Sequence, residues 1–527
     1  PGALAADEFH SDLLSERVTA HHPHPVSAFP EHQRFRRRLD ACHTYAALHH
    51  SLGGTPHLLH VARQLQELED AFETLSPAKA VAGAPELAAK VADLERSIAA
   101  GLAERLQSRA PENRPGYLVL NPCAFIRRVA LELEPGAQPL PIGGPVKACQ
   151  LDKEKLRVIL EVPALGFAWI PREGPVGTAP MPSKIRVVDP QQLVLRNEFF
   201  EAEVDAATGG LKAIRDHKTH VNRLAQRLVF NPGSRMVAKD IQVTQSGPAL
   251  AEIVSTGELL GEQDQLLARF TQRLRLWMSR PLLEMRITLR PEQPPAGYGW
   301  HAYFGSRFAW RDERAALLRS ASGTGYLTTH PRPQTPDYLE LRMGRQGTVI
   351  LPGGLPFHQR HEGRMLDVIL IPEGEQETTF DIGIALDREQ PMQTALGLVS
   401  PVAVVPTTKG PPHIGDSGWL FHLDAPNLVM TRLTPGAVEL PGYSSATTEQ
   451  EPGAEPASEP AAKTAVTARL FECGGHSGMA ELRCVRNPKR AVVLDGRGQF
   501  LLEAGISGDA VLLEVTPNDF VQVQVEF

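Results

Sequence analysis

Cysteine, aromatic residues and long hydrophobic runs are all scarce in this sequence of 527 residues. The five cysteines, an odd number with no Cys-x-x-Cys pair, exclude a disulfide scaffold and predict reduced thiols in a cytoplasm-like compartment. No apolar run approaches the roughly 18 to 20 residues that cross a bilayer, so a transmembrane protein is excluded. No signal peptide follows Pro1, and we therefore expect a cytoplasmic location and no membrane partner.

An excess of charge of one sign is also missing. Lys and Arg number 54 against 61 Asp and Glu, a net charge of −7, so we expect no nucleic-acid partner. Common catalytic motifs are absent too: there is no G-x-S-x-G nucleophile elbow, no phosphate-binding P-loop and no H-E-x-x-H zinc motif. Glycine and proline are abundant, with 44 and 45 residues, and such frequent breakers disfavour an all-helical protein.

Histidine is concentrated near the N-terminus, where ten of the nineteen His residues fall within positions 1–60. A zinc site needs three or four converging ligands, and the spacing here supports only local pairs. We therefore interpret these histidines as surface or helix-packing residues. The cysteines are too scattered for a zinc knuckle or a redox pair, and we interpret them as small buried hydrophobes.

The pattern of apolar residues predicts helices in the first part of the chain. Residues 1–30 are irregular, whereas apolar residues recur at helical spacing across 31–112. A Gly-Gly break at 53–54 separates the first two helices, and a third covers about 85–109. The pattern predicts a three-helix bundle.

From about residue 113 onward the period of the apolar pattern changes to two. Short alternating segments such as Phe199–Val204 are separated by turns rich in Gly, Pro, Asn and Asp, which predicts antiparallel β-sandwiches. We therefore predict an α+β, mainly β fold: the helical bundle, a small β-sandwich domain, a large β-sandwich, a low-complexity linker and C-terminal strands that pack on the sandwich. The predicted bounds of the four parts after the bundle are 113–185, 190–445, 446–463 and 464–527.

Two segments carry side chains suited to a ligand. Residues 300–310 concentrate aromatic residues and an arginine, a combination that suits sugar rings, although a core strand with aromatic packing is the alternative. Residues 357–364 place polar donors after a Gly-Pro turn, where they could reach a ligand; a solvated loop is the alternative. The candidate substrate-contacting residues are Trp300, Tyr303, Arg307, His358 and Arg360.

Several short motifs occur along the chain in a recognisable order. Leu118–Pro122 comes first, Leu195–Phe200 and Thr208–Leu211 follow, and Gly353–Pro356 comes later. In this order they resemble glycoside hydrolase family 38, the α-mannosidases, over about 31–527. The resemblance implies a large sandwich of the galactose mutarotase type behind a helical bundle. It also implies a parent enzyme that hydrolyses α-mannosides at a zinc-containing site.

The catalytic part of that family is a (β/α) barrel that precedes the bundle. This barrel supplies most zinc ligands and the catalytic carboxylates, which lie roughly 5 Å apart in a retaining glycosidase. Residues 1–30 leave no room for the barrel, so the resemblance implies the C-terminal, non-catalytic portion, without catalytic residues and without a cofactor of its own. His49–Thr55 resembles a zinc motif of the family, which makes His50 the candidate zinc ligand. The family's sandwich loops close over the sugar, which implies substrate contacts from Arg360 and His358.

Three functions remain open from the sequence. The first is the non-catalytic portion of a family-38-like α-mannosidase, whose partners are mannosides and its own catalytic barrel. The second is a stand-alone carbohydrate-binding or scaffolding protein, a pseudoenzyme. The third is an enzyme of the mutarotase type, in which His358 acts with Glu362 or Asp367. A chain that begins at Pro1 rather than Met is expected to be processed or a fragment.

Overall fold

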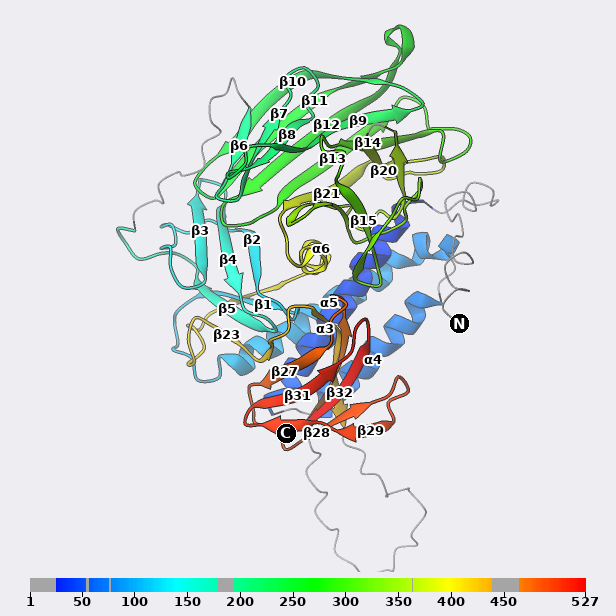
Figure 1. The fold of residues 1–527 in the computed structure, drawn as a ribbon. Helices are drawn as coiled ribbons and strands as arrows, with labels where there is room; N and C mark the ends of the chain where they lie inside the picture. Colours follow the sequence, from blue (N-terminus) through cyan, green and yellow to red (C-terminus); the bar gives the residue numbers. More distant parts are fainter. Residues whose placement is uncertain (1–24, 54–55, 75–76, 179–192, 363, 438–463) are drawn as a thin grey trace, which may run out of the picture.

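The structure, a computed structural model, describes residues 25–53, 56–74, 77–178, 193–362, 364–437 and 464–527 (Figure 1). Most of the predicted irregular segment 1–30 and all of the predicted linker 446–463 lie outside these residues. Antiparallel strands dominate the described part, and the helices lie between a large sandwich and the C-terminal sheets (Figure 1). The predicted α+β, mainly β fold class is confirmed.

Three helices form the predicted bundle. Their bounds are α3 Ala28–Ser51, α4 Pro56–Glu73 and α5 Pro77–Leu106. Helix α5 begins before the expected start at Pro85 because the alanine-rich stretch from 78 to 84 has high helix propensity and the helix continues through that proline. The rings of Phe35 and Phe72 stack with centroids 3.8 Å apart, which joins α3 to α4.

The large sandwich consists of two antiparallel sheets, and its two faces meet in one apolar core. A polar contact crosses this core, because the Gln226 amide donates to Gln272 Oε1 at 3.1 Å and to Ser306 Oγ at 3.0 Å. All three side chains are buried, and each needs these bonds to offset the loss of water. One sheet contains β10 Arg235–Ser246, β11 Leu250–Leu260, β12 Leu266–Trp277, β13 Leu283–Pro291, β21 Thr379–Leu386, β18 Gln346–Leu351, β17 Leu339–Met343, β15 Ala316–Ala321 and β16 Thr324–Leu327, in spatial order. The other contains β19 His358–His361, β20 Met365–Ile371, β14 Tyr303–Ala309, β9 Asn222–Asn231, β8 Leu211–Asp216, β7 Phe200–Val204 and β6 Val194–Arg196.

Two smaller sheets follow the bundle in the chain. They share a core of alternating apolar side chains, as the period-two pattern predicts. The first contains β22 Ala403–Thr407, β1 Gly116–Asn121, β5 Gly166–Pro171 and β23 Ser417–Trp419; the second contains β2 Arg127–Leu133, β4 Leu156–Val162 and β3 Val146–Leu151. Strands β22 and β23 thus pair with the small sheet although they fall within the predicted 190–445 domain, because an alternating pattern does not identify the partner of a strand. Helix α6, Pro391–Val399, leads into them.

The C-terminal strands share a core with the helices. Apolar side chains of α3 and α5, including Tyr45 and Leu102, belong to the same buried cluster as Val466, Leu470 and Val523. The 464–527 segment therefore packs on the helical bundle. It also contacts the large sandwich, because Phe471 and Cys473 share another buried cluster with Tyr338 and Val349. The strands are β24 Phe421–Leu423, β27 Gly478–Cys484, β31 Ala510–Val515 and β30 Gly505–Ser507 in one sheet, and β25 Leu428–Ala437, β26 Thr464–Glu472, β32 Phe520–Glu526, β28 Arg490–Leu494 and β29 Phe500–Glu503 in the other.

None of the helices in the described residues combines the length and the apolar character that crossing a bilayer demands.

Candidate functional site

Three neighbouring strands of the seven-stranded sheet bring four polar side chains together. Arg307 on β14 lies directly opposite Asp367 on β20, and Tyr303 shares the face of Arg307 because it is four residues away on the same strand. His361 enters from β19, which pairs with β20 on its other side. We call Tyr303, Arg307, His361 and Asp367 the Asp367 cluster.

The carboxylate of Asp367 accepts four contacts at the centre of this cluster. Arg307 binds it in a bidentate manner, with Nε 2.7 Å from Oδ1 and Nη2 2.7 Å from Oδ2. The Tyr303 hydroxyl donates to Oδ2 at 2.8 Å, and His361 Nε2 lies 2.8 Å from the same oxygen. Both carboxylate oxygens are therefore occupied by protein donors.

Burial and hydrogen bonding act in opposite directions on the acid at the centre. Asp367 has no exposed side-chain surface, which by itself raises the pKa of its carboxyl group. The hydrogen bonds from Arg307 and His361 outweigh this effect and lower the pKa of Asp367 below its ordinary value. Burial, followed by the negative charge of Asp367, raises the pKa of Tyr303, so its hydroxyl remains a donor.

This arrangement holds side chains in place and leaves no free base. A carboxylate with a lowered pKa and four donors is a poor proton acceptor and a poor nucleophile. Arg307 and His361 keep 17% and 20% of their side-chain surface exposed, so the buried acid fixes two donors at the edge of the solvent. Such fixed donors can bind hydroxyl-rich or anionic ligands.

The structure brings some of the predicted site residues together. Tyr303 and Arg307 from the aromatic segment meet Asp367, which the mutarotase-type hypothesis named. His361 was not singled out by the sequence analysis, although it lies in the second segment. Gln359 on β19 pairs with Asp367, and side chains two positions apart in a strand lie on the same face. Once that pairing is known, the alternation of β19 places His361 on the face of Asp367.

Other predicted site residues lie apart from this cluster. His358 is fully buried, its Nε2–H donates to Thr335 O at 2.8 Å, and burial lowers its pKa to about 4. Trp300 is also fully buried, with the Arg332 guanidinium 5.0 Å from its ring centroid. Arg360 is half-buried on β19, and its backbone N–H donates to Pro331 O at 2.7 Å. Direct ligand contacts of His358 and Trp300 require that the residues covering them move.

The predicted zinc ligand His50 lies in a poor setting for a metal. It is buried near the end of α3, and burial lowers its pKa. Among the residues that the structure describes, no three or more His, Cys, Asp or Glu side chains converge as a metal site requires. The described residues therefore do not fit a zinc ion, and no chemical step is assigned to one.

Comparison with solved structures relates this fold to known proteins. An α-mannosidase from Enterococcus faecalis V583 superposes over 98% of this chain and 68% of its own, with a TM-score of 0.66 at 13% identity. A glycosyl hydrolase family 38 protein from Enterococcus faecalis superposes over 98% of this chain and 71% of its own, with a TM-score of 0.65 at 13% identity. A galactose mutarotase-related enzyme from Lactobacillus acidophilus matches 37% of this chain at a TM-score of 0.23.

Comparison of the sequence with family models and curated proteins found no match. The likeness to the two Enterococcus structures thus establishes a shared fold. It confirms at that level the resemblance that the sequence motifs indicated: nearly the whole chain has the architecture of about two thirds of each of those proteins.

Proposed function

We propose that this chain is the non-catalytic portion of a family-38-like α-mannosidase, which supports and completes a sugar-binding site while a separate catalytic barrel hydrolyses the α-mannoside. The observation that carries this proposal is the superposition on 98% of this chain but only 68% and 71% of the two Enterococcus proteins. About a third of each of those chains has no counterpart in the alignment. In this proposal the partners are mannosides and the barrel, and zinc belongs to the complete enzyme.

The chemistry of the Asp367 cluster favours a non-catalytic role. Retaining glycosidases need two carboxylates roughly 5 Å apart, one of them able to gain and lose a proton. The Asp367 cluster has a single carboxylate, which is saturated by donors. In this proposal Arg307 and His361 are positioned to contact sugar hydroxyls, and Arg360 lies on the same strand as His361. The predicted contacts of His358 and Trp300, and His50 as zinc ligand, remain proposals that need the complete enzyme.

The test of this proposal is an activity assay on the purified chain. We expect no hydrolysis of 4-nitrophenyl α-mannoside with or without added zinc, because the Asp367 cluster has a single carboxylate that is already bound by donors. Co-expression with the barrel domain of a family 38 enzyme provides the positive arm, in which a stable complex with activity is expected. Turnover by the isolated chain that disappears on chelation would contradict the proposal.

A second candidate is a stand-alone carbohydrate-binding protein, favoured by the rigid presentation of Arg307 and His361. Calorimetric titration with mannose oligosaccharides tests it, with His361→Ala as the disrupting variant and the exposed turn substitution Arg345→Ala as the matched control. Binding by the isolated chain that is lost only in His361→Ala supports this candidate. The mutarotase-type alternative is disfavoured, because His358 is buried and Asp367 is saturated.

Five free cysteines agree with a reducing compartment. Four of the thiols are buried, and burial raises the pKa of Cys42 and of Cys484, the latter to about 12. Neither thiol is therefore ready to react as a thiolate. We propose a cytoplasmic location on this basis; formation of a disulfide in the purified, air-exposed chain would argue against it.

A further inference from the structure

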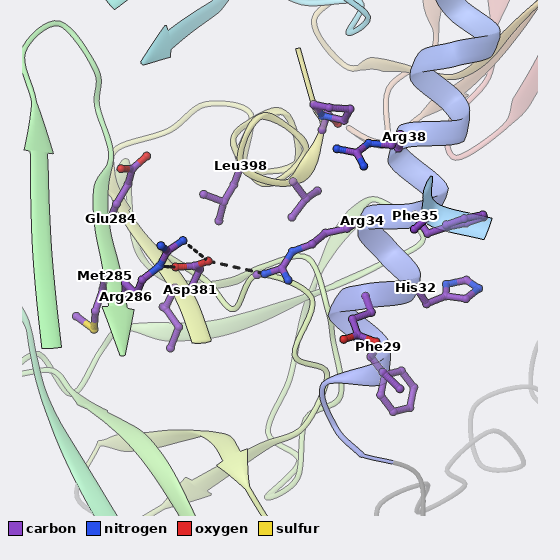
Figure 2. Close-up of a pocket in the computed structure, with 18 of the residues that line it drawn as sticks. Phe29, His32, Arg34, Phe35, Arg38, Glu284, Met285, Arg286, Asp381 and Leu398 are labelled. Carbon is purple, nitrogen blue, oxygen red and sulfur yellow. Dashed lines mark hydrogen bonds and ion pairs between the residues drawn. The ribbon is translucent and has the colours of Figure 1, made fainter. Parts of the chain in front are cut away.

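A cavity of about 1120 Å³ lies between the helices and the nine-stranded sheet, and its lining includes none of the four residues of the Asp367 cluster. Helix α3 borders one side, β12, β13 and β21 border the other, and α6 closes one end (Figure 2). Ligand sites are commonly about 300 to 1,000 Å³. The cavity is therefore large enough to hold a small organic molecule.

Both sides of the cavity combine apolar and charged side chains. The helical side carries aromatic rings from α3 and α4 and aliphatic side chains from α6, together with Glu31, His32, Arg34, Arg38 and Glu73. The sheet side carries three arginines, on β12 and β13. The apolar lining includes Phe29, Phe35, Phe72, Leu398 and Val399, and the arginines of the sheet are Arg273, Arg275 and Arg286.

Arg34 reaches across the cavity toward a carboxylate that already has a partner (Figure 2). Asp381 accepts a bidentate bond from Arg286, with Nε–Oδ1 at 2.7 Å and Nη2–Oδ2 at 3.1 Å. Arg34 Nη2 remains 3.9 Å from Asp381 Oδ2, too far for a hydrogen bond. Within the part of the chain that the structure describes, the Arg34 guanidinium makes no hydrogen bond, and half of its side chain is exposed.

The same pattern recurs on β12. Glu252 binds Arg275 Nε closely, while Arg273 Nε stays 3.8 Å from the same carboxylate oxygen. The cavity thus holds two guanidinium groups, those of Arg34 and Arg273, whose nearest carboxylate is already bound by another arginine. Arg275 also donates to Glu132 at 2.9 Å. What sets Arg34 and Arg273 apart is that neither guanidinium makes a hydrogen bond within the described residues, so their donors are available to a ligand.

The remaining acids around the cavity do not bind the donors of Arg34 or Arg273. Glu284 binds Arg280 and the Trp277 indole N–H, and Glu73 lies 3.1 Å from Arg36. Glu31 is exposed; burial and the negative charge of Glu377 raise its pKa, while the charge of Arg34 on the same helix acts to lower it, and no hydrogen bond joins Glu31 to Arg34 in the described residues. Arg38 is paired with Glu95 at 3.0 Å.

We propose that this cavity binds a small amphipathic anion, a molecule with one carboxylate, sulfonate or phosphate group on an aromatic or aliphatic body. The acidic group accepts hydrogen bonds from Arg34, with Arg273 adding to the favourable potential. The body packs against the apolar side chains of α3 and α6. Charge-assisted hydrogen bonds from arginine suit such a group, and burial of the body provides most of the affinity. The proposal is independent of the sugar site and of hydrolysis.

The test uses two fluorescent probes of similar shape and different charge. One is 8-anilinonaphthalene-1-sulfonate, which carries the anion; the other is N-phenyl-1-naphthylamine, which is the same aromatic body without it. We expect saturable binding of both to the full chain. In Arg34→Gln the sulfonate probe should bind about tenfold more weakly, the scale of one lost charge-assisted hydrogen bond, while binding of the neutral probe is unchanged.

Two further variants locate the site and control for charge. Leu398→Trp places a large ring in the cavity and should abolish binding of both probes. Arg345→Gln removes an exposed positive charge from the turn between β17 and β18 and should leave both probes unaffected. The proposal is overturned if Leu398→Trp leaves binding intact, or if Arg34→Gln and Arg345→Gln weaken the sulfonate probe equally. Thermal melting of each variant establishes that a lost signal does not come from unfolding.

Discussion

Two bidentate Arg–Asp pairs in the large sandwich differ in burial and in the two further donors, Tyr303 and His361, that Asp367 has, and both differences predict unequal effects on stability. In each pair the aspartate lies directly opposite the arginine on the neighbouring strand: Asp367 opposite Arg307, and Asp381 opposite Arg286. Asp367 has no exposed side-chain surface, whereas Asp381 is 39% exposed and Arg286 is 57% exposed. Replacing each aspartate by asparagine removes the same charge from two different environments.

The expected effects follow from what each change leaves behind. Asp367→Asn leaves the largely buried Arg307 guanidinium without its counter-charge, a loss worth about 3 to 5 kcal/mol in other buried pairs. Asp381→Asn breaks a solvent-screened pair, worth at most about 1 kcal/mol. For a domain of about 150 to 250 residues, the scale of the large sandwich, a change of about 1 kcal/mol shifts the melting temperature by roughly 2 to 4 °C. We therefore expect a fall of about 10 °C for Asp367→Asn and of no more than about 4 °C for Asp381→Asn.

Differential scanning calorimetry at pH 7 measures both shifts on the full chain. The pH dependence provides a second readout. Because the folded-state pKa of Asp367 is lowered, its stabilising effect is present at neutral pH and is lost as the pH falls through that value, below the ordinary 3.8. The difference between wild type and Asp367→Asn should therefore shrink in acid. Equal shifts for the two variants at pH 7 would refute the argument from burial.

Three other predictions concern the helices and the small sheet. Burial lowers the pKa of His43 to about 3, so His43 stays neutral in the folded state while the unfolded state binds a proton below about pH 6.5. Lowering the pH from 6.5 to 5 should therefore reduce the free energy of unfolding by about 2 kcal/mol, measured by denaturant titration. The variant His43→Gln should not show this reduction. The Tyr45 hydroxyl donates to Leu120 O and accepts from Ala403 N–H, both at 3.1 Å, so Tyr45→Phe should destabilise by about 1 to 3 kcal/mol, and a change below about 0.5 kcal/mol would speak against this bridge between α3 and the small sheet. A Cβ at Gly166 would meet Gly418 O at 2.2 Å, so Gly166→Ala should accelerate amide hydrogen exchange in β23, with Gly505→Ala, which meets only side-chain atoms at 3.5 Å or more, as its control.

Local pattern was enough to predict the helices and the type of fold. The apolar stripe that includes Phe35, Leu39 and Cys42 is buried in α3, and the period-two segments became strands. The partners of the strands could not be predicted in this way. Strand β22 pairs with β1 across almost 300 residues of sequence, and no property of an alternating segment identifies a partner at such a distance.

The candidate site shows the same limit. Tyr303 and Arg307 were predicted together because they lie four residues apart in one strand. Their common partner Asp367 is 60 residues beyond Arg307, and only the register between β14 and β20 brings the two together. His358 was expected to contact a ligand because it is polar, but its alternation on β19 turns it away from Asp367 and into the core, where Thr335 O satisfies its N–H. The cavity between α3 and β13 is formed by residues far apart in the sequence, so no local sequence pattern predicts it.

The core that α3 shares with the C-terminal strands can form only after nearly the whole chain has been synthesised. Arg486 Nη1 donates to Ser51 O at 3.0 Å, and this bond closes a separation of 435 residues. At a translation rate of about 5 to 20 residues per second, the ribosome needs roughly 20 to 90 s to make that length. Until β25 and β26 have been made, the face of α3 that later contacts them has no strands to cover it. The nascent helices therefore expose apolar surface until the last sheet has been synthesised.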